Sequence, residues 1–324
     1  MKRARPDGRS DEQLRPLSVE LGVHLSADGS ARLSCGAWWL ARGRPHGART
    51  RGARSVPPRG RAAPLPLPLH LTDLPLLFFP RNHIKTCRLS LLYSPPPGDT
   101  RVVASVLGPR PCRTARLEDS ERCQLEVVVT PLGGTAGPAE AELCALLRQA
   151  LAACLALGAH PRKVLTIAVH VLADDGGAAA AAVNAAVLAL ADAGVPMRAL
   201  ASAVTLGVRS SSASSSSSSS CSSAAAVQLD LTREEAAAAS ATALAVFSAE
   251  TPEAPLAVLT AGPLPLAALQ RALAVGGHAA AAVLTFQRGA LREKVQRDAS
   301  AHFQSVLGVS AEALEGVGAA VARG

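Results

Sequence analysis

Alternation of apolar and polar residues predicts most strands of this chain. The stretch LSVELGVHLSADGSARLSCG (17–36) alternates around Asp28-Gly29 and predicts a β-hairpin. The run VLTIAVHVLAD (164–174) is almost uninterrupted in its apolar character, which is typical of a strand buried on both faces. Further strands are predicted at 100–108, 123–132, 199–208, 226–232, 241–250 and 254–262.

Longer apolar runs with helix-ending residues predict three helices. The first covers 138–158, with Pro138 near its start and Gly158 as its C-cap. The second covers 177–193, and the third runs from 264 to about 301 with a break at Gly276-Gly277. Groups of strands interleaved with long helices predict an α+β fold with mixed sheets packed with long helices.

Two segments show neither the alternation of a strand nor the apolar pattern of a helix. Residues 37–98 hold eleven of the 23 prolines and both tryptophans, and they carry ten Lys or Arg against one Asp. Their net charge of +9 exceeds the +8 of the whole chain, so the rest of the chain is close to neutral. The pI of 9.6 is therefore no argument for RNA binding by the folded part. The serine-rich stretch 209–226 predicts a flexible loop.

Few residues offer a recognisable chemical motif. The sequence lacks GxSxG, P-loop, HExxH and GxGxxG motifs. Its eight histidines show no metal-ligand spacing. Its seven cysteines are scattered, which predicts reduced thiols in an intracellular compartment. Asp174-Asp175-Gly176-Gly177 could hold a metal but fits an N-terminal helix cap better. The N-terminus lacks a signal peptide, and the apolar runs are interrupted, so the sequence predicts a soluble protein with no membrane span.

Basic residues outside the proline-rich segment are the candidate RNA contacts. A loop between two predicted strands is basic, and a second basic pair precedes a strand. These residues could touch RNA phosphates, although a solvated loop needs no such function. They are Arg110, Arg113, Arg116, Arg122, Arg162 and Lys163.

Several motifs together resemble one family. RPDGRSDEQLRPLSVELG, ADGSARLSCG, GDTRVVASVLGPRP (from Gly98) and LADDGGAAAAAVNAAVLALADAGVPMRAL are similar to the RNase PH family of phosphorolytic 3′-to-5′ exoribonucleases. DAGVPMRAL with the upstream VNAA is most similar to the branch that forms ring subunits of the eukaryotic RNA exosome. The resemblance covers about 5–36 and 98–300.

The resemblance implies a fold, partners and a location. The fold is of the ribosomal protein S5 domain 2 type. The expected partners are other RNase PH-like exosome ring subunits in a hetero-oligomeric ring, S1/KH-type cap subunits, and RNA, with no membrane. The expected location is the nucleus, including the nucleolus, and the cytoplasm.

The residues that phosphorolysis needs are incomplete. The family's arginine-containing segment after the third strand is replaced by TPLGGTAGPAEAE, and its Gly-x-Arg phosphate motif falls on Pro161-Arg162-Lys163. Of two aspartates six positions apart, the first is Asp230, while the second falls on Ala236, with Glu235 beside it. The resemblance thus implies a vestigial metal position at Asp230 and Glu235, no catalytic residues and no cofactor.

Three functions remain open at this point. The first is a non-catalytic ring subunit that supports 3′-to-5′ RNA processing and degradation. The second is an active phosphorolytic exoribonuclease with Asp230 and Glu235 holding Mg²⁺. The third is a free-standing RNA-binding protein that uses the +9 segment.

The predicted organisation is a single RNase PH-like domain with one large insertion. The domain covers 1–36 and 98–316, with the serine loop inside it and a tail at 317–324. Removing residues 37–97 joins two stretches into ADGSARLSCGDTRVVASVLGP, give or take one glycine. We therefore predict that 37–97 is a disordered insertion at a hairpin turn, most economically a retained intron, which transcript sequencing across the junction would test.

Overall fold

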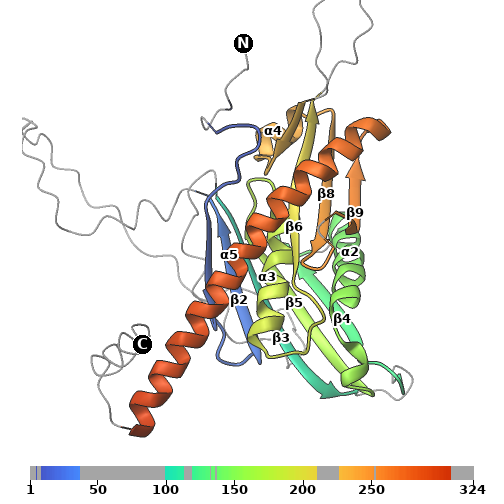
Figure 1. The fold of residues 1–324 in the computed structure, drawn as a ribbon. Coiled ribbons are helices and arrows are strands. Elements are labelled where there is room, and N and C mark those ends of the chain that lie inside the picture. Colours follow the sequence, from blue (N-terminus) through green and yellow to red (C-terminus); the bar gives the residue numbers. More distant parts are fainter. Residues whose placement is uncertain are drawn as a thin grey trace, which may run out of the picture. The chain divides into compact units, whose positions relative to one another are not determined.

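Two β-sheets form the framework of the chain. The computed structural model describes residues 5, 9–36, 99–112, 119–131, 133–135, 137–209, 226–251 and 253–307. The first sheet has the strand order β1-β2-β3-β5-β4 (Figure 1). Strands β4 and β5 are parallel and the other neighbours are antiparallel, so this sheet is mixed. Its strands are β1 (Leu17–Leu21), β2 (Gly29–Cys35), β3 (Thr100–Pro111), β4 (Gln124–Thr130) and β5 (Lys163–Ala173).

The second sheet is antiparallel, with the order β7-β6-β8-β9. Its strands are β6 (Ala201–Arg209), β7 (Ala226–Leu229), β8 (Ala241–Ser248) and β9 (Pro255–Ala261). The helical elements are α2 (Pro138–Cys154), the 3₁₀ turn η3 (Leu157–Ala159), α3 (Ala178–Asp192), α4 (Arg233–Ala238) and α5 (Leu266–Leu307). The predicted α+β class with a mixed sheet and long helices is confirmed.

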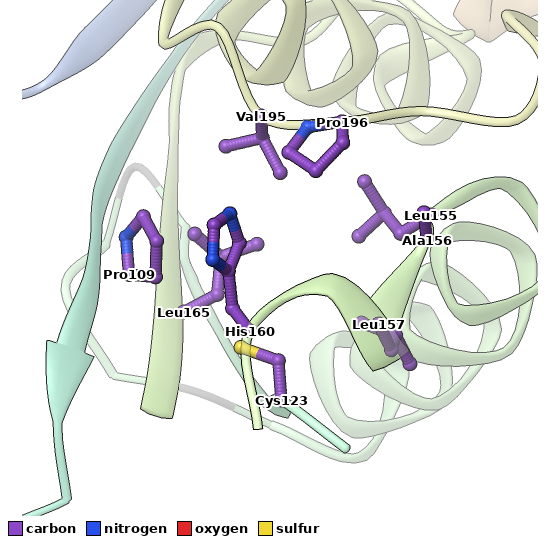
Figure 2. Close-up of a pocket in the computed structure, with 9 residues that line it drawn as sticks. All are labelled: Pro109, Cys123, Leu155, Ala156, Leu157, His160, Leu165, Val195 and Pro196. Carbon is purple, nitrogen blue, oxygen red and sulfur yellow. The ribbon is translucent and has the colours of Figure 1, made fainter. Parts of the chain in front are cut away.

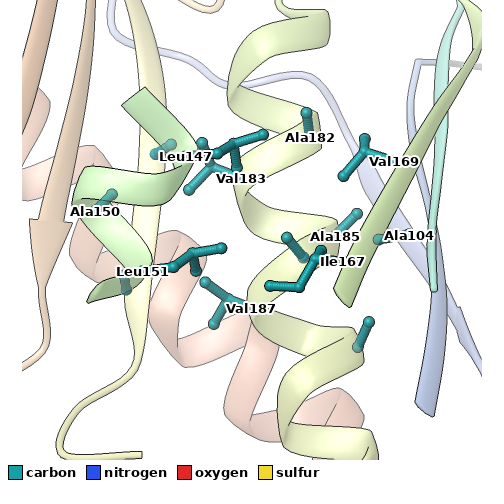
Figure 3. Close-up of a cluster of buried hydrophobic side chains, with 14 of the residues drawn as sticks. Ala104, Leu147, Ala150, Leu151, Ile167, Val169, Ala182, Val183, Ala185 and Val187 are labelled. Atoms are coloured by element: carbon teal, nitrogen blue, oxygen red, sulfur yellow. The ribbon is translucent and has the colours of Figure 1, made fainter. Parts of the chain in front are cut away.

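Helix α3 is the centre of the core. Every residue from Ala180 to Leu190 is buried, which is expected of a helix that is apolar on all sides. Figure 3 shows Val183 and Val187 of α3 facing α2, while Ala182 and Ala185 lie toward β5. Small alanine side chains let the helix approach the strands closely, and close packing of this kind fixes the position of both sheets.

Helix α5 differs from its prediction. It continues through Gly276-Gly277 as one helix of 42 residues. An added Cβ at Gly276 would lie 3.1 Å from Leu206 and 3.4 Å from Phe247, so the glycine allows α5 to approach the second sheet. The predicted break is wrong because this packing outweighs the low helix propensity of two glycines, about 1 kcal/mol each.

The structure adds three smaller details to the sequence predictions. The connection of the first hairpin covers residues 22–28, and Gly29 is the first residue of β2. The short helix α4 was not predicted, although Thr232 and Glu235 form a capping box at its start. The prediction that Asp174-Asp175-Gly176-Gly177 caps α3 is confirmed in place, because the N-cap is Gly177 with φ +74, and no side chain of this cluster donates or accepts the capping bond.

The strand register bears directly on the site of the predicted insertion. Cys35 at the end of β2 lies opposite Thr100 at the start of β3. Antiparallel neighbours at such a position can be joined by a two-residue turn. Residues 37–97 and the serines at 210–225 lie outside the described residues, so the predicted insertion, serine loop and domain limits stay predictions.

One helix within the described ranges, α5, is long and apolar enough to cross a membrane by length and composition. Its buried residues Ala268, Ala272, Ala280 and Val283 pack against the second sheet. A helix that buries one face against a sheet can pass the same test, and 39% of the apolar window of α5 is buried in this way.

Candidate functional site

The predicted vestigial metal position lies where β7 ends and α4 begins. Asp230 directly follows β7, with φ +49, a left-handed conformation that Asp tolerates better than most residues. Its backbone N–H donates to the carbonyl of Thr205 at 2.9 Å, which fixes this turn to β6. Five residues later, Glu235 sits in the first turn of α4 and is buried.

Arg15, from the segment before β1, forms a bidentate ion pair with the Asp230 carboxylate. Its Nε donates to Oδ2 at 3.0 Å and its Nη2 to Oδ1 at 2.7 Å, and its backbone N–H also donates to Oδ2 at 2.8 Å. The remaining guanidinium N–H groups donate to the carbonyls of Gly176 at 2.9 Å and Asp175 at 3.3 Å. Arg15 is 5% exposed, so this bidentate pair is shielded from water.

The protonation of Arg15 reflects two opposing effects. Burial opposes its charge, but the hydrogen bond and the negative charge of Asp230 outweigh this and raise the pKa of Arg15. The guanidinium is therefore a fixed cation beside Asp230.

Arg5 and Arg9 complete the set. The Nε of Arg5 lies 3.0 Å from Oε1 of Glu235. Arg9 lies between the two acids, with Nη1 3.7 Å from Oδ2 of Asp230 and Nη2 3.9 Å from Oε2 of Glu235. We call Arg5, Arg9, Arg15, Asp230 and Glu235 the arginine–carboxylate cluster.

The surroundings of the cluster are apolar and tight. An added Cβ at Gly177 would lie 3.1 Å from Nη2 of Arg15 and 3.4 Å from Oδ1 of Asp230, so the start of α3 lies against the pair. Burial and then the charge of Asp230 raise the pKa of the neighbouring Cys35 to about 12, so this thiol stays protonated. The hollow beside Asp230, which Cys35 and Thr205 also line, has a volume of about 30 Å³. That volume holds one or two waters, so it is too small for a nucleotide.

A divalent cation does not fit this arrangement. Mg²⁺ needs near-octahedral oxygen ligands at about 2.1 Å, usually with several waters. Both oxygens of Asp230 accept hydrogen bonds from Arg15, and Oε2 of Glu235 accepts the backbone N–H of Thr232 at 3.0 Å. Among the residues that the structure describes, no group of three or more His, Cys, Asp or Glu side chains could hold a metal.

The predicted RNA contacts gather elsewhere, at the opposite end of the first sheet. Arg110 in β3 pairs with Val164 of β5, and Pro111 pairs with Lys163. Arg162 precedes Lys163, and Arg122 lies two residues before β4, whose first residue pairs with Val164. These four residues, Arg110, Arg122, Arg162 and Lys163, form what we call the basic sheet end; Arg113 and Arg116 lie outside the described residues.

The basic sheet end is open to solvent. The side chain of Arg110 is 57% exposed and lies 3.6 Å from Asp28, and the other three residues are also exposed. Figure 2 shows the apolar hollow next to it, lined by Pro109, Cys123 and His160 among others. Its volume of about 10 Å³ holds about one water, so no base can enter.

The two sites lie far apart. The Thr100 hydroxyl donates to the carbonyl of Gly176 at the cluster, while Arg110 and Pro111 end the same strand. Twelve strand residues span roughly 35 Å at 3.3 Å per residue. The structure therefore does not bring Arg162 to Asp230, so the motif match at Pro161-Arg162-Lys163 supplies no phosphate-binding cation beside the acidic pair.

Sequence reasoning missed Arg5, Arg9 and Arg15. They are separated from Asp230 and Glu235 by more than 200 positions, and a charged N-terminal stretch is ordinarily solvated. A usable signal did exist, because Arg15 directly precedes Pro16 and the first alternating strand, which ties it to the sheet.

Part of the chain matches a known family. Residues 97–196 match the model described as "3' exoribonuclease family, domain 1" (RNase PH). "Exosome complex exonuclease RRP46 homolog" of Arabidopsis thaliana is 36% identical over 107 residues, 33% of this chain and 44% of that protein. The protein of the same name from Oryza sativa subsp. japonica is 37% identical over 111 residues, 34% of this chain and 46% of that protein.

An archaeal protein, "Exosome complex component Rrp41" of Nitrosopumilus maritimus, is 32% identical over 118 residues, 34% of this chain and 48% of that protein. The chain thus spans about half the length of the curated relatives it matches. These matches confirm the resemblance to the RNase PH family and to its exosome branch.

Two solved structures share the fold. The crystal structure of rice Rrp46 has a TM-score of 0.63 at 24% identity, covering 89% of this chain and 100% of that one. The Archaeoglobus fulgidus exosome "with RNA bound to the active site" has a TM-score of 0.53 at 17% identity, covering 90% of this chain and 92% of that one. The predicted RNase PH-like fold is confirmed.

Proposed function

We propose that this chain, whose residues 97–196 match an RNase PH family model and which has an RNase PH-like fold, is a non-catalytic ring subunit of an RNA exosome. In this role it supports 3′-to-5′ RNA processing and degradation, including processing of ribosomal RNA and decay of messenger and non-coding RNA. Its neighbours in the ring are other RNase PH-like subunits, with S1/KH-type subunits on the cap. Its relatives are named as exosome complex components, which supports this assignment.

The observation that carries the non-catalytic part is the state of Asp230. A carboxylate that places a metal ion or assists a leaving group must present free oxygens to the substrate. Here both oxygens are engaged by the buried Arg15, and Arg9 faces the same carboxylate. The position six residues after Asp230 is Ala236, which offers no ligand.

The basic sheet end supports a role in contacting RNA without cutting it. Its cations are exposed, as phosphate-binding side chains are, and they lie on the sheet far from the acidic pair. Such contacts hold an RNA strand regardless of its sequence.

An RNA-shortening assay tests the absence of catalysis. The purified chain is incubated with labelled single-stranded RNA and Mg²⁺, with and without inorganic phosphate, beside its Asp230→Asn variant. We expect wild type and variant to give the same low background. Phosphate-dependent shortening by the wild type that the variant lacks would establish the alternative, an active phosphorolytic exoribonuclease.

Co-purification tests the ring role. A tagged chain is isolated from cells under native conditions, and the mass of the intact complex is measured. We expect one copy in a hetero-oligomer with other RNase PH-like subunits. Recovery only as a free chain would refute the ring assignment. The same tagged chain, imaged in cells, tests the predicted location in the nucleus, nucleolus and cytoplasm.

A further inference from the structure

We propose that Asp230 and Glu235 act as a metal-independent anchor for the N-terminal segment, and that the guanidinium of Arg9 takes the position of a bridging divalent cation. This inference concerns the arginine–carboxylate cluster alone. It holds whether or not the chain assembles into a ring.

The first argument is the geometry around Arg9. Its two terminal nitrogens face one oxygen of each acid, at 3.7 Å from Asp230 and 3.9 Å from Glu235. The same guanidinium reaches the backbone carbonyls of Gln13 at 3.3 Å and Asp230 at 3.4 Å. A cation that bridges the two carboxylates would have to displace this group.

The second argument is the occupation of the remaining oxygens. Arg15 takes both oxygens of Asp230, and Arg5 lies 3.0 Å from Oε1 of Glu235. The backbone N–H of Thr232 takes Oε2 of Glu235. Each of the four carboxylate oxygens therefore already has a charged or hydrogen-bonding neighbour, and for Oε1 of Glu235 that neighbour is the charge of Arg5 without a hydrogen bond.

The third argument is charge. Arg15 also lies 3.5 Å from Asp175, so three arginines face three carboxylates. The side chains of Arg5, Arg9 and Arg15 are at most 10% exposed, and such buried ions are stable only when paired. A divalent cation would bring two further positive charges to carboxylates that these arginines already pair.

The fourth argument is what the cluster joins. Its arginines precede β1 of the first sheet, and its acids follow β7 of the second sheet. Neighbouring bonds join the same two parts of the chain: Leu229 donates its N–H to the carbonyl of Asp11 at 2.8 Å, and Gln228 donates to the Asp11 carboxylate at 3.0 Å. The N-terminal segment is thereby fastened across β7 and α4.

The metal part is tested with Mn²⁺ on the full chain. Amide resonances of isotope-labelled protein are recorded during a Mn²⁺ titration, because a bound Mn²⁺ broadens signals around it. We expect no broadening confined to the amides near Asp230 and Glu235. Local broadening there, lost in Asp230→Asn, would overturn the proposal.

The anchor part is tested by hydrogen exchange of the full chain. In Glu235→Gln, which keeps the shape of the side chain, we expect amides in residues 9–15 to lose protection at least tenfold. The matched control is Glu234→Gln, an exposed neighbour, for which we expect no change. Equal protection in wild type and Glu235→Gln would refute the anchor. If Glu235→Gln does not fold, Arg9→Gln, at the solvent side of the cluster, is read in the same way.

Discussion

Asn184 holds together three elements of the core, and its replacement should cost much of the stability of the fold. Its Nδ2 donates to the carbonyl of Ala203 at 3.0 Å, and its Oδ1 accepts the N–H of Ala203 at 2.8 Å. Nε2 of Gln287 donates to the same Oδ1 at 3.2 Å. Strand β7 pairs with β6 only from Leu206 onward, so it does not reach Ala203. The amide group of Asn184 therefore makes the two hydrogen bonds to Ala203 that a neighbouring strand would make.

The expected loss in Asn184→Ala follows from these bonds. Asn184, Ala203 and Gln287 are all buried, so the N–H and carbonyl of Ala203 and the amide of Gln287 would lose partners inside the protein. An unsatisfied buried group costs roughly 1–3 kcal/mol, so three such groups predict a loss of about 3 to 9 kcal/mol. That is a large share of the free energy of unfolding of a typical domain.

Urea denaturation followed by far-UV circular dichroism measures the difference in free energy of unfolding. The control is Thr285→Ala on α5, which removes one exposed bond to the carbonyl of Ala281. We expect the control to change stability by less than about 0.5 kcal/mol. A loss below about 1 kcal/mol in Asn184→Ala would refute the view that this amide replaces a strand.

Three further predictions concern other parts of the chain. Deleting residues 37–98 leaves a two-residue turn in place of a 64-residue connection. If the segment adds no contacts, five halvings of the loop length at about 0.6 kcal/mol each predict that the free energy of unfolding rises by about 3 kcal/mol. A deletion variant that is less stable than the wild type in urea would contradict this. The fold raises the pKa of Cys35 from an ordinary value of 9.0 to about 12, so the unfolded chain releases this proton at a lower pH than the folded chain. Between pH 9 and 12 the free energy of unfolding of the wild type should therefore fall more steeply than that of Cys35→Ala, by about 1.4 kcal/mol per pH unit. Parallel pH profiles of the two proteins would argue against this. Single-stranded RNA binding is measured by fluorescence anisotropy at several salt concentrations. Replacing Arg162 and Lys163 by alanine should reduce the slope of log binding constant against log salt concentration by about 1.4, whereas Arg271→Ala should leave the slope unchanged. Equal slopes would exclude the basic sheet end as the contact.

The sequence pattern predicted what depends on neighbouring residues. Strands such as 164–174 and the apolar helix 177–193 were recognisable because burial acts on successive side chains. The break at Gly276-Gly277 was wrong because the contacts of Gly276 with Leu206 and Phe247 come from distant strands. Local propensity holds no information on such contacts.

The candidate site was predictable in part for the same reason. Asp230 and Glu235 were identified from the family resemblance of the short stretch that holds them, and the structure places them together. Their partners Arg9 and Arg15 could not be identified, since the pairing depends on the N-terminal segment crossing to the second sheet. The incomplete aspartate motif predicted that phosphorolysis is absent. The ion pairs that the two acids form with arginines are seen only in the fold.

The pairing of Cys35 with Thr100 has a consequence beyond this one chain. A connection whose two ends are already opposite each other can change in length without shifting a strand or exposing the core. Products that differ only between these two positions would share one fold. The same position is therefore a suitable place to insert an affinity tag or a fluorescent domain, because the two strands keep their pairing whatever joins them.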